Sequence, residues 1–104
     1  MTFESLVSRV DVDKEYLYRN RYGKPTSDTF RVLSKDAQKI TFLTASSETH
    51  SLREQDWDEV VKNLLSLRNG GLKRHDLKTW RPSYAYAFIG HFESLGTVFI
   101  PQSE

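Results

Sequence analysis

The sequence contains no cysteine, which excludes disulfide bonds, thiolate metal sites and cysteine nucleophiles. It has no apolar run near the roughly 20 residues that a membrane helix requires, and residues 1–4 do not open a signal-peptide hydrophobic region. These absences favour a cytoplasmic protein with no membrane partner. Glycine and proline number only five and three in 104 residues, and no repeat or linker is visible. We therefore expect a single domain over residues 1–104.

Enzyme motifs are also missing. The three histidines, at positions 50, 75 and 91, fall in three different expected elements. Gly70-Gly71 lacks the surrounding pattern of a phosphate-binding loop and instead indicates the end of a helix. The acids Asp56, Asp58 and Glu59 suit the first turns of a helix, where they complement its dipole, better than a metal site. We predict a non-enzymatic protein with no catalytic residue, no metal and no cofactor.

Charge is balanced overall but clustered along the chain. Fifteen basic and fourteen acidic residues give a net charge of +1, and the isoelectric point is about 8.0. Residues 62–81 contain six basic residues against one acid, and residues 14–24 contain four against one. Between them, residues 46–59 contain five acids against one base. Basic clusters of this size attract anionic partners and make binding dependent on salt, although solvated charged faces have the same composition.

The first half of the chain predicts a helix followed by a β-meander. Four apolar residues have the spacing of a short amphipathic helix: Phe3, Leu6, Val7 and Val10. The runs 29–33 and 39–45 are rich in β-branched and aromatic residues and predict a hairpin, which a third strand at 49–52 extends. The hairpin side chains expected in the core are Phe30, Val32, Ile40 and Phe42.

The second half predicts three helices and a closing strand. The helices are expected over about 54–67, 72–79 and 83–95, and the strand over 97–100. Ser51-Leu52-Arg53-Glu54 has the form of a capping box for the first of them. The third helix is expected to bury Ala85, Phe88, Ile89, Phe92 and Leu95. Its outward face would then present Tyr84, Tyr86, Ala87, Gly90 and His91.

This order of elements resembles a winged helix-turn-helix. The resemblance rests on Leu-Leu-Ser-Leu-Arg-Asn-Gly-Gly-Leu at 64–72, Asp76-Leu77, Ser83 and Leu95-Gly96-Thr97-Val98. The resemblance covers residues 54–100. Together with the elements expected in the first half, it implies an α+β fold in which an N-terminal helix and a small antiparallel β-meander pack on a three-helix, helix-turn-helix-like unit with a closing strand. It also implies binding of nucleic acid, DNA above all. The residues it assigns to phosphate contacts are Lys73, Arg74, Lys78 and Arg81, and those it places near bases are Ser83, Tyr84 and Tyr86.

Two other interpretations stay open. The order of hairpin, helix, Gly-Gly-Leu, Ser-Tyr-Ala helix and strand is similar to small accessory modules of restriction and other DNA-processing enzymes, which implies a role in DNA processing or defence. Alternatively, a tyrosine- and arginine-rich segment has the composition of a protein-interaction or assembly surface: Tyr16, Tyr18, Arg19, Arg21 and Tyr22. An ordinary three-helix packing with a purely structural aromatic core fits the same pattern. The oligomeric state and the choice among DNA, RNA and protein are not specified by the sequence.

Overall fold

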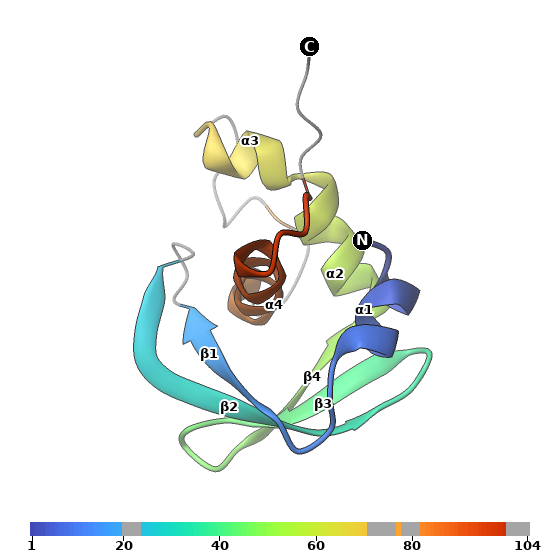
Figure 1. Ribbon diagram of the computed structural model, residues 1–104, viewed down its shortest axis with the longest axis vertical. Coiled ribbons are helices and arrows are strands. Elements are labelled where there is room, and N and C mark those ends of the chain that lie inside the picture. The colour runs from blue at the N-terminus through green and yellow to red at the C-terminus, as the bar shows by residue number, and fades with distance from the viewer. Residues whose placement is uncertain (20–23, 71–76, 78–81, 100–104) are drawn as a thin grey trace.

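The computed structural model describes residues 1–19, 24–70, 77 and 82–99, and it has an α+β fold. Its four strands form one antiparallel sheet in the order β1-β2-β3-β4. The sheet curves around α4, and α1 and α2 lie on the same side of it (Figure 1). In chain order the elements are α1 (Phe3–Arg9), β1 (Glu15–Arg19), β2 (Pro25–Lys35), β3 (Lys39–Leu43), β4 (Thr49–Arg53), α2 (Glu54–Lys62), α3 (Leu64–Arg68) and α4 (Pro82–Ser94).

The predicted helix and meander of the first half are confirmed, and β1 adds a strand between them. The Thr2 hydroxyl accepts a hydrogen bond from the Ser5 amide at 3.1 Å and so caps α1. Alternation along β2 and β3 places every second side chain in the core, as expected from period-two strands. The four predicted hairpin residues are each at most 2% exposed: Phe30, Val32, Ile40 and Phe42.

The helix α4 lies at the centre of the hydrophobic core. The Phe88 ring lies 5.2 Å from the ring of Tyr16 and 5.4 Å from that of Phe30, measured between centroids. On the same helix, the Tyr84 ring lies 4.2 Å from the ring of Phe42. Because the sheet covers one side of α4 and α2 packs against it as well, seven of its thirteen residues are buried.

This burial corrects the expected outward face of the third helix. Tyr84 is 7% exposed and Ala87 is 2% exposed, so neither presents its side chain to solvent. Leu95, which was expected in the core, is 69% exposed because it lies beyond the last residue of α4. The boundaries of α4 lie within one residue of those predicted, but the face that this helix presents to solvent differs from the predicted face.

Three further local expectations change. The helix expected over 54–67 is divided into α2 and α3 at Asn63, whose side-chain amide donates to the Glu59 carbonyl at 2.8 Å. Ser51 does not cap α2, because it lies in β4; instead the Arg53 amide donates to the Asp56 carboxylate at 3.4 Å. No strand forms over 97–99, the described part of the expected closing strand. The helix expected over 72–79 falls outside the described residues except for Leu77, which is buried.

Candidate nucleic-acid interface

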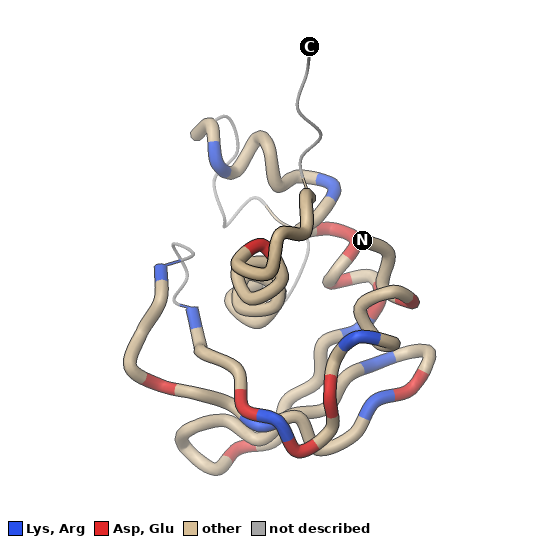
Figure 2. The backbone as a smooth tube through the Cα atoms, viewed as in Figure 1, with Lys and Arg blue, Asp and Glu red and all other residues tan. Residues whose placement is uncertain are grey.

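Within the basic segment 14–24, the strand β1 packs along α4. The space that a β-carbon on Gly90 would occupy is filled by the Arg19 guanidinium, so β1 and α4 approach closely at this pair. One residue earlier, the Tyr18 ring lies 5.3 Å from the Tyr84 ring near the start of α4. Figure 2 shows basic residues at the neighbouring ends of β1 and β2. The Arg19 cation of this segment is therefore held beside the helix that the sequence marked as functional.

The second basic segment is described in part. Lys62 is exposed at the end of α2. The Arg68 guanidinium donates to both carboxylate oxygens of Glu93, at 2.9 and 2.5 Å, and this pairing ties α3 to α4. The hydrogen bonds to Glu93 raise the pKa of Arg68 above its usual range. Of the four residues expected to contact phosphate, Lys73, Arg74, Lys78 and Arg81, all lie outside the described residues.

The residues expected near bases are distributed differently from the prediction. Ser83 and Tyr84 are 6% and 7% exposed on α4, and Tyr86 is half-buried. No face of α4 therefore offers these three side chains together to a groove of nucleic acid. Tyr84 nevertheless reaches the wall of a surface pocket.

The predicted tyrosine- and arginine-rich contact segment is divided between core and surface. Tyr16 is 2% exposed, and its hydroxyl accepts a hydrogen bond from the Asp11 amide at 3.1 Å. Burial raises the pKa of the Tyr16 hydroxyl, and the ring serves the core instead of a partner. Tyr18 and Arg19 are half-buried, with part of each side chain accessible. Arg21 and Tyr22 lie outside the described residues.

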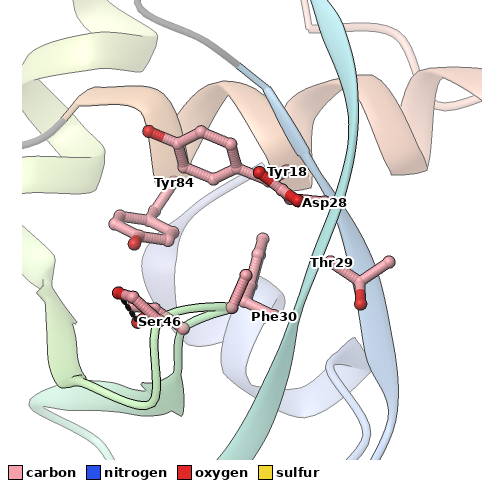
Figure 3. A pocket seen from close by; sticks show the side chains of 8 residues that line it. Tyr18, Asp28, Thr29, Phe30, Ser46 and Tyr84 are labelled. Carbon is pink, nitrogen blue, oxygen red and sulfur yellow. Dashed lines mark hydrogen bonds between the residues drawn. The ribbon is translucent and has the colours of Figure 1, made fainter.

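A pocket of about 220 Å³ opens beside Tyr18 (Figure 3). Its aromatic part consists of the rings of Tyr18, Phe30 and Tyr84. Its polar part comes from the N-terminal part of β2 and from the turn between β3 and β4. The polar lining side chains are Asp28, Thr29, Thr44 and Ser46. Figure 3 shows Asp28 and Ser46 on opposite sides of the opening. The pocket thus combines ring surface with a hydrogen-bond acceptor on one side and a hydroxyl on the other.

The sequence analysis missed Asp28 and Ser46. Asp28 stands two and four residues before Phe30 and Val32, so strand alternation places it on the core-facing side of β2. The sequence feature that could have indicated a site was therefore a carboxylate on the core-facing side of β2, close to where this strand begins. Ser46 carried no comparable signal, because the β3–β4 turn reaches the pocket through the curvature of the sheet.

The described histidines do not assemble a catalytic group. His50 on β4 has its ring nitrogen Nε2 3.1 Å from the Glu48 carboxylate, whereas His91 packs edge-on against Tyr16 with ring centroids 4.8 Å apart. Across the described ranges, no group of three or more His, Asp or Glu side chains is placed to hold a metal ion. No helix among the described residues is long and apolar enough to span a bilayer.

The face of the sheet away from α4 carries apolar side chains. Leu17 is 45% exposed and Leu33 is 39% exposed, and Leu43 is directly opposite Arg31 in the β2–β3 register. Arg31 is also paired with Glu15 at 3.4 Å across β1 and β2. We call these five residues the outer sheet face. It mixes exposed leucines with one ion pair.

No family model matches the chain, and comparisons with curated proteins and with solved structures find no match either.

Proposed function

We propose that this chain is a non-enzymatic binding module for nucleic acid, with its contact surface at the N-terminal end of α4 instead of on an outward face of that helix. The observation that carries the proposal is the position of β1, with Arg19 over Gly90 and Tyr18 against Tyr84. Through Tyr18, β1 reaches the N-terminal end of α4, which the second basic segment precedes in the chain, and the Arg19 guanidinium lies further along the same helix.

The order of residues supports the convergence of the two segments. Arg81 is the residue before Pro82, which begins α4, and Tyr84 follows two residues later. Tyr18, which contacts Tyr84, is the residue before Arg19. A polyanion bound at this end of α4 would meet basic residues from both segments, and the positive end of the helix dipole would add to their attraction. Accessory modules of DNA-processing enzymes are one setting for such a surface.

The test is fluorescence anisotropy with labelled single-stranded DNA, duplex DNA and RNA, at about 50 and about 200 mM salt. The variant Arg19→Gln/Lys24→Gln removes two cations at the end of β1 and the start of β2. We expect it to weaken binding and to lower the slope of the logarithm of the binding constant against the logarithm of the salt concentration by about 1.4 to 1.8, because each of two lost phosphate contacts contributes about 0.7 to 0.9. Lys39→Gln/Arg53→Gln, which removes two exposed cations that lie opposite each other on β3 and β4, is the matched control. No binding at the lower salt, or equal losses in both variants, would contradict the proposal.

The outer sheet face favours a second candidate, an assembly domain that pairs with another copy of itself. Its leucines flank the Glu15–Arg31 pair, so a two-fold contact would place each arginine near a glutamate of the other copy. Sedimentation over a range of concentrations tests this candidate. A dimer that dissociates when Leu17→Glu is introduced would support this candidate. A monomer at every concentration would contradict it.

A further inference from the structure

The aromatic pocket has the size and the lining that suit a small planar ligand. Its volume of about 220 Å³ lies below the 300–1,000 Å³ typical of sites for drug-sized molecules, so it suits a single heterocyclic base whose attached sugar stays outside the pocket. The rings of Tyr18 and Tyr84 are inclined by 61° and form a corner. A planar ligand would lie on one ring and meet the edge of the other, with Phe30 behind them.

The carboxylate of Asp28 lies at the rim of the pocket. Within the described part of the chain, no hydrogen bond or ion pair engages the side chain of Asp28. Its backbone amide is satisfied by the Thr26 hydroxyl at 3.2 Å, which fixes the local backbone. An ionised carboxylate accepts hydrogen bonds and cannot donate them, so the ligand must offer N–H groups on this side.

The opposite side of the pocket can donate. The Thr44 hydroxyl accepts from the Glu48 amide at 3.1 Å and lies 3.1 Å from the Ser46 hydroxyl. When Thr44 donates its proton to Ser46, the Ser46 proton is left for a ligand acceptor. The pocket therefore presents an acceptor at Asp28 and a donor at Ser46, with ring surface between them.

Guanine has the complementary pattern. Its Watson–Crick edge carries two neighbouring N–H donors beside a carbonyl acceptor, whereas thymine and uracil carry one N–H between two carbonyls. A carboxylate facing thymine would meet carbonyl oxygens and repel them. We propose that this pocket holds one unpaired guanine, with its N–H groups on Asp28, its carbonyl on Ser46 and its ring on Tyr18. This inference rests on the proposed nucleic-acid binding.

The surrounding charge favours a base over a cationic side chain. Aromatic rings beside a carboxylate also suit a methylated lysine. However, Arg19 follows Tyr18 directly, and Lys24 precedes β2, the strand that carries Asp28. Basic residues this close in the chain to lining residues disfavour a cationic ligand and attract the phosphates that flank a base.

The experiment compares single-stranded oligothymidylates of about 10 nucleotides that carry one central guanine, adenine, cytosine or thymine. Anisotropy at low salt measures each affinity with the intact chain. We expect the guanine probe to bind about 10-fold more tightly than the all-thymine probe, because hydrogen bonds to a charged group discriminate by that order.

Three variants test the assigned contacts. Asp28→Asn is expected to abolish the guanine preference without weakening the all-thymine probe, since the phosphate contacts stay and the carboxylate that repels the thymine carbonyls is lost. Asp58→Asn, at an exposed carboxylate on α2, makes the same charge change away from the pocket and should keep the preference. Tyr18→Leu should weaken the guanine probe about 10-fold through lost stacking, with circular dichroism confirming that the chain remains folded.

The outcomes separate this inference from the proposed function. Equal binding of all four probes, or the same preference in Asp28→Asn and Asp58→Asn, would overturn the guanine site while nucleic-acid binding stands. A trimethyllysine peptide that competes with the guanine probe for the intact chain, but not for Asp28→Asn, would assign the pocket to a cationic side chain and overturn the inference. Failure of every oligonucleotide to bind would overturn both proposals.

Discussion

The contact between Arg19 and Gly90 makes a prediction that a double-mutant cycle can measure. Gly90 is an interior residue of α4, and its missing side chain leaves the space that the Arg19 guanidinium occupies. Replacing glycine by alanine inside a helix normally stabilises it by about 1 kcal/mol. At Gly90 the added methyl group must first displace the guanidinium, which is the flexible end of its side chain.

The two effects should nearly cancel in the wild-type background. Losing the packing of a half-buried arginine stem and head on the helix costs about 0.5–1 kcal/mol, a typical value for a partly buried contact. Gly90→Ala alone should therefore change the free energy of unfolding by about zero. In an Arg19→Ala background the space is already empty, so the same change should stabilise by about 1 kcal/mol. The expected coupling free energy between the two positions is about 0.5–1 kcal/mol.

Urea unfolding of the four chains in the cycle measures this coupling. With a slope of about 1–2 kcal/mol/M, the effect of Gly90→Ala on the midpoint should differ by about 0.5 M between the two backgrounds. A second cycle that replaces Gly90→Ala by Ser66→Ala, at an exposed site on α3, should be additive. Equal stabilisation by Gly90→Ala in both backgrounds would refute the reasoning, because it would mean that Arg19 does not lie on α4.

Two further predictions concern the same core. Trp57 is fully buried, and its indole N–H donates to the Met1 carbonyl at 3.1 Å. Trp57→Phe should therefore lower the free energy of unfolding by about 1–3 kcal/mol. A change below about 0.5 kcal/mol in urea titrations would show that this contact is absent. Burial, and secondarily the charge of Lys14, lowers the pKa of His91 from its ordinary 6.5, so the unfolded chain binds the proton more readily. Stability should then fall as the pH drops below about 6.5, and His91→Gln should reduce that fall; identical pH profiles of the two chains would contradict it.

The parts of the fold that were predicted correctly depend on local periodicity. Phe30, Val32, Ile40 and Phe42 alternate with polar residues, and a strand with that pattern has only one way to bury its apolar side. Phe3, Leu6 and Val10 specify α1 in the same manner, through helical spacing. These patterns need no knowledge of the rest of the chain.

The position of α4 was mispredicted because a one-sided stripe was assumed. Residues 82–92 are apolar on nearly every side, with Tyr84 and Ala87 off the main stripe, and a helix that is apolar all round is usually buried all round. That signal was present in the sequence. The pocket was not predictable in this way, since Tyr18, Asp28 and Ser46 meet through sheet curvature and through contacts distant in the chain.

The most direct test of the central claim is a titration of ¹⁵N-labelled protein with single-stranded DNA, followed by amide chemical shifts. Saturable shifts are expected at Tyr18, Arg19, Lys24 and Tyr84, with Lys39 and Arg53 unchanged. Shifts confined to the leucines of the outer sheet face, or no shifts at low salt, would contradict a nucleic-acid surface at the N-terminal end of α4.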